Sequence, residues 1–449
     1  MVDKKMLTIQ QIRDAGVVGA GGAGFPTCAK LDAKADTLVC NAAECEPLLH
    51  KDKEILRNFP KKVIRGLRIA AERVGAERVV VGLKRKYHDI HDLLAPLLPS
   101  DFELFPLNDI YPAGDEFILV YETLGRVIPP GGLPLHTGTV VLNVETAFHL
   151  AEVEEGVSNT HKFLTVAGAI RTPMSLRVPI GCSILDCIEA AGGATLEEPV
   201  VLVGGPMMGH LVDSPRTTLV TKTTGGVILL PQDHPLVEKI RRPLRDTLRI
   251  ARSACDQCSF CTELCPRNLL GHPVEPHKAM RGLLFGADAL IPGTQFCSGC
   301  NLCARCSCPE GLDPCRVMQT NRQKWVESRE RWENPPFRKN RPFIHMQNRQ
   351  TPIPKLVRRL GLEIFNQPAP LDLERSNEIS PRSVGIPVKQ HIGAPCVPCV
   401  AEGARVAEGE CVGTPPTQDG KSALGAAIHA SIRGRVAKIA DGVIWIERE

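Results

Sequence analysis

The sequence predicts a multidomain protein that joins an α/β domain, two β-rich domains and a cysteine-rich domain. A chain of 449 residues is too long for one hydrophobic core, so three or four domains are expected. Helical and extended patterns alternate in the first third of the chain, and short apolar runs dominate two later regions. Nine of the eighteen cysteines fall between Cys255 and Cys308, which separates a cysteine-rich domain from the rest.

The first domain, predicted over residues 1–155, reads as alternating strands and helices. Leu38 to Cys40 form a strand-like run, and residues 78–82 form a second short buried strand. Between them, apolar residues from Val63 to Val74 recur at helical spacing. This alternation favours a partly parallel sheet.

The remaining chain divides into four further regions of different texture. Residues 156–240 contain short apolar runs and one helix-like segment, which indicates a β-rich domain. The other boundaries are set by the cysteines, by a polar segment rich in arginine and proline, and by a final set of short strands with glycine turns. The cysteine-rich domain is predicted over residues 241–325, the polar linker over 326–380 and the last domain over 381–449.

Charge and hydropathy exclude several classes of function. The net charge is only +4 and the acidic and basic residues are interleaved, so no nucleic-acid partner is expected. No apolar run approaches the roughly 20 residues that cross a bilayer, so no membrane span is expected. The amino terminus lacks the apolar core of a signal peptide. A cytoplasmic location is therefore expected, and its reducing conditions argue against structural disulfides.

The first cysteine motif has the spacing of bacterial ferredoxins. Its cysteines follow the pattern C-x-x-C-x-x-C-x-x-x-C-P, and they are Cys255, Cys258, Cys261 and Cys265. In this pattern three cysteines hold one cluster and the fourth ligates the other cluster. The motif predicts a low-potential iron–sulfur cluster, most simply [4Fe–4S], used for electron transfer.

The second motif repeats this spacing with one ambiguity. It begins with Cys297, Cys300 and Cys303, and Cys306 and Cys308 follow. The proline after Cys308 favours Cys308 as the fourth ligand, and Cys306 is the alternative. Crossed ligation then assigns the ligands to two clusters: Cys255, Cys258, Cys261 and Cys308 for one, and Cys265, Cys297, Cys300 and Cys303 for the other.

Zinc is the competing interpretation of these cysteines. Zinc ribbons use two C-x-x-C pairs separated by a longer loop. A third cysteine at the same spacing in each half, with a closing proline, fits zinc poorly. Two clusters that pass single electrons are therefore expected.

A glycine-rich loop near the amino terminus could cradle a phosphate. Residues 19–27 read GAGGAGFPT, and Lys30 follows as a nearby cation. The loop matches neither a Walker motif nor a dinucleotide fingerprint, and alone it is a weak signal. Two further blocks follow in order: residues 39–53, which include NAAECEP and KDK, and residues 111–147, which include YPAGDE, GGLP and NVETA.

Together these three blocks resemble the flavin-binding region of the NADH-oxidising subunit of respiratory complex I. They resemble the C subunit of Rnf electron-transport complexes still more closely. The resemblance implies non-covalent FMN, with NADH as the electron donor. It implies that the FMN phosphate lies near the glycine loop and Lys30, and that NADH stacks over the flavin near Phe25 and Glu46.

The same resemblance implies the other residues around the cofactor. The glycine loop would contribute Gly21, Gly22 and Gly24, and the isoalloxazine and ribityl chain would lie among Asn41, Glu44, Glu116, Asn143 and Thr146. Two positions depart from the complex I pattern. Ala43 replaces an acid and Cys45 replaces a glycine, which bears more on nicotinamide binding than on flavin binding.

The later domains extend the resemblance over almost the whole chain. Residues 164–168 and 203–209 are similar to the soluble-ligand-binding β-grasp (SLBB) domain, and residues 390–395 and 428–434 are similar to a lipoyl-like barrel-sandwich hybrid. In the Rnf C subunit that last module stands first. The order found here, with the run RNLLGHP at 267–273, resembles the cobalamin reductases of propanediol utilisation in bacterial microcompartments.

That resemblance implies an oxidoreductase that passes electrons from NADH through FMN and two [4Fe–4S] clusters to cobalamin. The expected acceptor is cobalamin or a corrinoid-handling enzyme, and the other expected partners are shell or lumen proteins of a microcompartment. No catalytic acid or base is required. The alternatives are an Rnf-C-like electron-transfer protein and a non-enzymatic electron relay with a degenerate nicotinamide site.

Two histidines and a cysteine pair in the last domain add weaker signals. His391 and His429 are interpreted as structural hydrogen-bonding residues in preference to cobalt ligands. Cys396 and Cys399 form a C-x-x-C that could be redox-active or bind a metal. Two cysteines without further ligands do not make a metal site.

Overall fold

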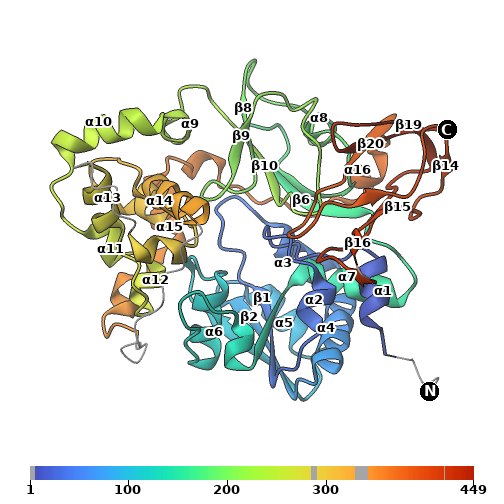
Figure 1. The fold of residues 1–449 in the computed structure, drawn as a ribbon, viewed down its shortest axis with the longest axis horizontal. Coiled ribbons are helices and arrows are strands. Elements are labelled where there is room, and N and C mark those ends of the chain that lie inside the picture. The colour runs from blue at the N-terminus through green and yellow to red at the C-terminus, as the bar shows by residue number, and fades with distance from the viewer. Residues whose placement is uncertain (1–5, 285–290, 329–341, 419) are drawn as a thin grey trace.

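A four-stranded parallel sheet organises the first domain. The computed structural model describes residues 6–284, 291–328, 342–418 and 420–449 (Figure 1). The sheet order is β3-β2-β1-β5, and every neighbouring pair is parallel, where the sequence predicts a partly parallel sheet. These strands are β1 Thr37–Ala42, β2 Arg78–Lys84, β3 Phe102–Leu107 and β5 Thr139–Asn143.

Helices cover both faces of this sheet. Alternate strand residues such as Leu38 and Val79 face α4 and α7, and the intervening residues such as Val39 and Val80 face α6. The helices of this domain are α1 Ile9–Asp14, α2 Thr27–Leu31, α3 Lys51–Asn58, α4 Pro60–Val74, α5 His88–Leu94, α6 Glu116–Leu124 and α7 Val144–Glu154, with a 3₁₀ turn η1 at Pro134–Thr137. Strands β1, β2 and β5 are therefore buried on both sides, which explains their apolar runs, whereas the edge strand β3 is partly exposed.

Local capping fixes where two of these helices begin. The Asp115 side chain accepts hydrogen bonds from the N–H groups of Phe117 and Ile118 at the start of α6. The Asn143 side chain accepts from Glu145 N at the start of α7. These capping residues belong to the runs YPAGDE and NVETA of the sequence, so both runs place helix starts at the sheet edge.

The second domain is a five-stranded mixed sheet with the order β7-β6-β10-β8-β9. The central pair β6 and β10 is parallel and the other pairs are antiparallel. Helix α8 (Ile184–Ala190) packs on it as expected, and its strands are β6 His161–Gly168, β7 Met174–Pro179, β8 Val200–Val203, β9 His210–Val212 and β10 Gly226–Leu230.

The cysteine-rich domain is built from short helices and turns. They are α9 Pro235–Arg241, α10 Leu244–Ala254, α11 Phe260–Glu263, α12 Pro266–Leu269, α13 Pro276–Leu284, η2 Pro292–Phe296, a π-helical turn at Cys303–Ser307 and α14 Pro314–Ser328. Figure 1 shows this domain beside the first domain, with α12 near α6. No helix in the described part of the chain is both long and apolar enough to cross a membrane.

The segment predicted as a linker differs from that expectation. Its described part, from residue 342, forms η4 Met346–Arg349, β11 Thr351–Pro352, α15 Ile353–Arg359, η5 Glu363–Phe365 and α16 Leu373–Glu378. Strand β11 pairs with β4 (Ile110–Tyr111), and the buried Leu356 and Leu360 join the core shared with the second domain. Apolar residues at helical spacing within a polar segment therefore anchor it. Residues 329–341 of the predicted linker lie outside the described residues.

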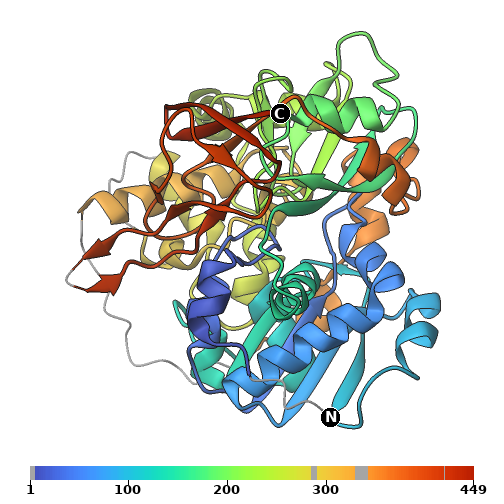
Figure 2. The same ribbon diagram turned by 90° about the vertical axis from the view of Figure 1, so that its right-hand side faces the viewer.

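The C-terminal module is a small β structure made of two sheets. The sheet orders are β12-β20-β19-β14 and β13-β15-β18, with a separate β16-β17 hairpin. Its strands are β12 Ser383–Pro387, β13 Val397–Pro398, β14 Arg405–Val406, β15 Cys411–Thr414, β16 Thr417–Gln418, β17 Lys421–Ser422, β18 Ile428–His429, β19 Gly434–Ala440 and β20 Val443–Arg448. Figure 2 shows this module in red next to the dark-blue amino-terminal segment. Backbone bonds from Ala427 N to Arg13 O and from Ile392 N to Gly24 O join the two.

Candidate cofactor sites

The residues predicted to surround a flavin gather at the carboxyl ends of two neighbouring strands. Asn41 near the end of β1 is paired in register with Asn143 at the end of β5. Asn41 Nδ2 donates to Gly114 O at 2.8 Å, which brings the YPAGDE loop to the same place. In parallel sheets the loops beyond the carboxyl ends of strands form the ligand crevice. Three motifs far apart in the sequence therefore meet at one sheet edge.

The glycine loop lies against the start of α7. Ala20 N donates to Thr146 Oγ1 at 3.0 Å, and a Cβ placed on Gly21 would lie 3.6 Å from Asn143 Nδ2. Gly22 has a φ of 108°, which favours glycine, and a Cβ there would have no neighbour within 4 Å. Because N–H groups at a helix amino terminus attract anions, this exposed loop beside α7 fits the phosphate of FMN.

Lys30 and Glu116, both predicted cofactor residues, are brought together as an ion pair. Lys30 Nζ lies 2.9 Å from Glu116 Oε1 and 3.0 Å from Val141 O. Phe25, also predicted, is half-buried, and its carbonyl oxygen accepts a hydrogen bond from Gly19 N at 2.8 Å within the loop. The cation predicted near the phosphate is thus fixed to the carboxylate at the start of α6.

Glu44 lies at the same edge, where it is held by Asp52, a residue that was not among the predicted cofactor residues. Glu44 Oε1 accepts from Asp52 N at 2.8 Å, and Asp52 Oδ2 accepts from Asn143 Nδ2 at 2.9 Å. Burial, and then the nearby Asp52 carboxylate, raise the pKa of Glu44 to about 7. Asp52 belongs to the KDK run of the second block, and that run was the available signal for it.

A buried charge network lies beneath this edge and was not predicted. Glu145 at the start of α7 is bound by Lys51 of α3, at 2.9 Å, and by Lys162 of β6. Its other oxygen accepts from Phe163 N at 2.9 Å. The network joins the first domain to a strand of the second domain.

The side chain of Glu46 contacts the second domain, whereas that of Glu44 contacts the start of α3. Its Oε2 accepts from Met207 N at 2.9 Å, and its Oε1 is buried without a hydrogen-bond partner among the described residues. Burial raises the pKa of Glu46 to about 7. Arg305 of the cysteine-rich domain lies close enough to interact with this carboxylate and donates to Pro206 O. Glu46 therefore lies where three domains meet.

Four cysteines of the crossed assignment line one cavity. They are Cys255, Cys258, Cys261 and Cys308. Backbone N–H groups of Glu310 and Leu312 donate to the Cys308 thiol, as is typical of cluster ligands. Cys306 instead is packed in the core formed with α15, near Lys355 and Arg359. We call the four thiols that line the cavity, those of Cys255, Cys258, Cys261 and Cys308, ring one.

The other four cysteines form a second group, ring two. They are Cys265, Cys297, Cys300 and Cys303, whose thiols are close enough to raise the pKa values of one another. Backbone N–H groups of Arg267 and Asn268 donate to the Cys265 thiol, which matches the surroundings of Cys308. The assignment of these eight cysteines to two iron–sulfur clusters stays a prediction, since no group of three or more described side chains is already arranged to hold a metal ion.

Cys315 was missed by the sequence reasoning. It is buried at the start of α14, and its thiol interacts with Cys297 and Cys303 of ring two. It has no C-x-x-C partner, so the spacing rule gave no signal for it.

Ring two is the one packed against the first domain. Tyr111 Oη donates to Cys300 O at 2.8 Å. Arg267 pairs with Asp115 at 2.7 Å, and its guanidinium lies 3.6 Å from the ring centre of Phe117. The described residues that line the cavity of ring one, in contrast, all belong to the cysteine-rich domain, and its Cys258 is exposed.

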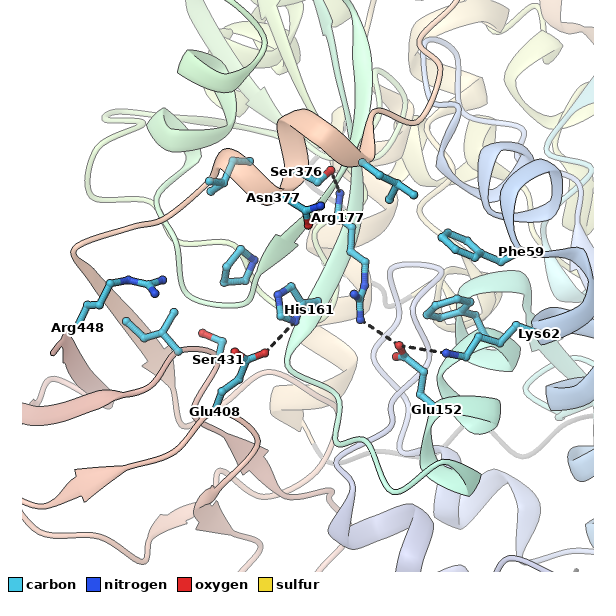
Figure 3. A pocket seen from close by; sticks show the side chains of 15 residues that line it. Phe59, Lys62, Glu152, His161, Arg177, Ser376, Asn377, Glu408, Ser431 and Arg448 are labelled. Atoms are coloured by element: carbon cyan, nitrogen blue, oxygen red, sulfur yellow. Dashed lines mark hydrogen bonds and ion pairs between the residues drawn. The ribbon is translucent and has the colours of Figure 1, made fainter.

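A separate cavity of about 400 Å³ lies where the first, second and C-terminal domains meet (Figure 3). Figure 3 shows Arg177 pointing to Glu152, a pair separated by 3.0 Å, and His161 near Glu408. Burial lowers the pKa of His161 to about 4, so this imidazole is neutral at pH 7. None of the predicted cofactor residues lines this cavity.

Four family matches cover the chain in the order that the sequence predicts. Residues 12–152 match the Nuo51 FMN-binding domain, 163–211 the SLBB domain, 254–313 the 4Fe-4S dicluster domain and 373–447 the RnfC barrel sandwich hybrid domain. The predicted domain types are confirmed. The chain thus carries an FMN-binding domain and a domain for two [4Fe–4S] clusters.

Curated relatives match the chain at two levels. The chain is 41% identical over 444 residues to "Cobalamin reductase PduS" of Salmonella typhimurium, which covers 98% of this chain and 96% of the relative. It is 39% identical to the protein of the same name from Citrobacter freundii, with 98% and 96% covered. It is 35% identical over 271 residues to the C subunit of the Na(+)-translocating ferredoxin:NAD(+) oxidoreductase complex of Acetobacterium woodii, with 58% of each chain covered.

Proposed function

The chain belongs to the family of the cobalamin reductases PduS, and we propose that it transfers electrons from NADH, through FMN and two [4Fe–4S] clusters, to cobalamin. The family assignment rests on 41% identity over 98% of the chain. We call the sheet edge at Asn41 and Asn143, with the glycine loop beside it, the flavin edge. The observation that carries the proposal is the direct packing of ring two on the domain that holds the flavin edge, through Tyr111 and Arg267. A route for single electrons requires this adjacency.

The flavin edge supplies the groups that would hold FMN. Gly21, Gly22 and the start of α7 offer backbone N–H groups to the phosphate, with Lys30 as the nearest predicted cation. The other proposed contacts with the cofactor or NADH are Gly24, Phe25, Asn41, Glu44, Glu46, Glu116, Asn143 and Thr146. FMN, when bound, takes two electrons from a nicotinamide and passes them on singly.

Glu44 and Asp52 set the charge at this edge. Glu44 accepts from Asp52 N, and Asp52 accepts from Asn143 Nδ2. Burial and then the Asp52 carboxylate raise the pKa of Glu44 to about 7, so a substantial fraction of Glu44 is protonated near neutral pH. A neutral Glu44 avoids repulsion of an anionic cofactor. The proposed role of Glu44 is to bind the flavin and to fix its orientation.

The two rings define the proposed order of transfer within the cysteine-rich domain. Ring two lies next to the flavin edge and ring one ends at the exposed Cys258, so ring two accepts electrons first and ring one delivers them. In ring two, Cys265 and Cys303 are buried, and Cys297 and Cys300 are half-buried. The exposed side of ring one is where a cobalamin or a corrinoid-handling enzyme would approach.

We place the protein within or on a bacterial microcompartment. The support is the family name alone, since the related cobalamin reductases carry the propanediol-utilisation designation. Shell or lumen proteins of that compartment are the corresponding partners.

A second candidate function is an electron relay that binds flavin without oxidising NADH. Cys45 favours it, because it stands where the complex I pattern has glycine, and its thiol accepts from Gly114 N at 3.4 Å inside the flavin edge. A side chain at this position narrows the space available to a nicotinamide.

The test is an anaerobic titration of the protein reconstituted with iron, sulfide and FMN. Bleaching of the flavin and cluster bands by NADH, followed by reduction of added cobalamin, is the expected result. If the bands ignore NADH and respond only to dithionite, the reductase proposal fails and the relay remains. Cys45→Gly is the matched variant, since it should accelerate NADH oxidation if the thiol obstructs the nicotinamide.

A further inference from the structure

The C-x-x-C of the C-terminal module has no part in the proposed electron route. The structure separates its two cysteines. Cys396 is buried, and its thiol donates to Ala426 O at 3.3 Å and lies 3.7 Å from His391 Nε2. Cys399 is exposed at the end of β13. The two members of the sequence motif therefore have different surroundings.

Cys399 instead faces Cys411, which is twelve positions later in the chain. Their sulfur atoms are 3.9 Å apart. Strands β13 and β15 are antiparallel neighbours, and Cys399 N donates to Val412 O at 3.0 Å, so the backbone already holds the two residues side by side. Apart from each other, the described partners of these thiols are carbonyl oxygens, Cys411 O at 3.3 Å from Cys399 and Gly413 O at 3.6 Å from Cys411.

We propose that Cys399 and Cys411 form an oxidisable dithiol, which low-molecular-weight disulfides convert into a reversible disulfide at the edge of the C-terminal module. A disulfide bond is about 2.0 Å long. The sulfur atoms must approach by roughly 2 Å, and rotation of the exposed Cys399 side chain supplies this movement without a change in strand pairing.

The reaction is a two-step thiol–disulfide exchange with oxidised glutathione as the oxidant. The Cys399 thiolate attacks one glutathione sulfur, forms a mixed disulfide and releases one glutathione thiolate. The Cys411 thiolate then attacks the Cys399 sulfur and releases the second. Two protein thiols lose two electrons, one glutathione disulfide gains them, and the two thiol protons pass to the two glutathione thiolates.

Exposure of Cys399 distinguishes this pair from another thiol pair outside the two rings. Cys182 and Cys187 also interact through their thiols, but both are 0% exposed in the core of the second domain. No oxidant in solution reaches them in the folded protein. Burial raises the pKa of Cys411 to about 11, so the exposed Cys399 makes the first attack. The buried pair is an internal control.

The disulfide would close a loop that includes β14, which is paired with β19. The same module is bonded to the glycine loop through Ile392 N and Gly24 O. Oxidation therefore stiffens the loop around β14, in a module that packs on the glycine loop through other residues. The expected effect is slower proteolysis between Cys399 and Cys411.

The experiment uses the reconstituted holoprotein under anaerobic conditions. After incubation with oxidised glutathione, free thiols are alkylated and tryptic peptides are analysed by mass spectrometry; cleavage after Arg405 separates the two cysteines. The expected result is a cross-link between Cys399 and Cys411, reversed by dithiothreitol, with Cys182 and Cys187 fully alkylated after denaturation. Iron content, measured in parallel, should be unchanged.

Two variants complete the test. Cys411→Ser should leave Cys399 as a mixed disulfide with glutathione, and Cys396→Ser should leave the cross-link intact. Alkylation of both Cys399 and Cys411 in the native chain after oxidation would overturn the proposal. A cross-link from Cys399 to Cys396 would overturn it as well.

Discussion

At the scale of single residues, the choice between two neighbouring cysteines determines which thiol completes ring one. Cys306 and Cys308 are two positions apart in the sequence, and the motif alone left both open. In the structure the π-helical turn directs Cys306 into the core with α15 and leaves Cys308 among the thiols of ring one. The proline rule therefore favoured the cysteine that the geometry also favours.

Substitution of these two cysteines should have opposite results. Cys308→Ser removes a thiol from ring one, so the reconstituted protein should bind about half of its iron and lose one cluster signal in electron paramagnetic resonance. Cys306→Ser changes a core residue only and should retain all of the iron. Retention of full iron by Cys308→Ser, with loss in Cys306→Ser, would reverse the assignment.

Glu46 should make stability depend on pH. Its folded-state pKa of about 7 exceeds the ordinary value of 4.5, so the folded state binds more protons between these pH values and loses stability as pH rises through them. Glu46→Gln should therefore melt at the same temperature as the parent near pH 5 and roughly 2 °C higher at pH 8, measured calorimetrically without cofactors. Glu374→Gln, on the exposed face of α16, is the control. An equal melting temperature at pH 8 would show that Glu46 is not desolvated.

Single residues also mark the limit of sequence reasoning at the site. The motif resemblance supplied Asn41, Glu44 and Asn143, which the structure gathers at one edge. Asp52 and Cys315 could not be found in this way, because their importance comes from contacts with residues distant in sequence.

At the scale of elements, helix α4 depends on a glycine that periodicity cannot explain. Gly66 lies in the middle of α4, where glycine costs about 1 kcal/mol relative to alanine. A Cβ at this position would lie 1.7 Å from Ala147 O in α7. Close helix packing, and not helix propensity, therefore selects the residue.

Gly66→Ala should destabilise the first domain by about 2–3 kcal/mol despite its better helix propensity. The clash is with backbone, which cannot rotate away. Urea denaturation of the apoprotein, followed by circular dichroism, measures the change. Lys61→Ala on the exposed side of the same helix should change stability by less than about 0.5 kcal/mol. A neutral Gly66→Ala would mean that α4 and α7 are further apart.

The buried network around Glu145 should be equally sensitive. Glu145→Ala leaves Lys51 and Lys162 buried without this carboxylate, and the expected loss is about 3–5 kcal/mol in the same denaturation experiment. Glu155→Ala removes a half-exposed partner of Lys62 just beyond the end of α7 and should cost less than about 1 kcal/mol. Similar losses in the two variants would contradict the buried network.

At the scale of the whole molecule, local patterns predicted the domains better than they predicted their packing. Strand and helix periodicity, cysteine spacing and ordered motifs each act within one region of sequence, so the domain types and the parallel sheet were accessible. The segment after residue 342 was predicted as a linker because it is polar. Its few apolar residues are buried by a neighbouring domain, which no local pattern encodes.

The packing of domains also gives the electron route its direction. Arg267 joins the cysteine-rich domain to Asp115 at the start of α6, and Tyr111 joins the same region to Cys300. Both contacts bring ring two, and not ring one, against the domain that carries the flavin edge. The central claim is therefore a linear order of donor, flavin, ring two, ring one and acceptor.

The most direct test of this order is anaerobic stopped-flow spectroscopy of Cys258→Ser, reconstituted with FMN and iron and mixed with NADH and cobalamin. The variant lacks a thiol of ring one and keeps ring two intact. The account predicts that NADH still reduces the flavin and the remaining cluster at the parent rate, whereas cobalamin reduction falls at least tenfold, about 1.4 kcal/mol in the barrier. Cobalamin reduction at the parent rate, in protein shown by iron analysis to lack one cluster, would contradict it.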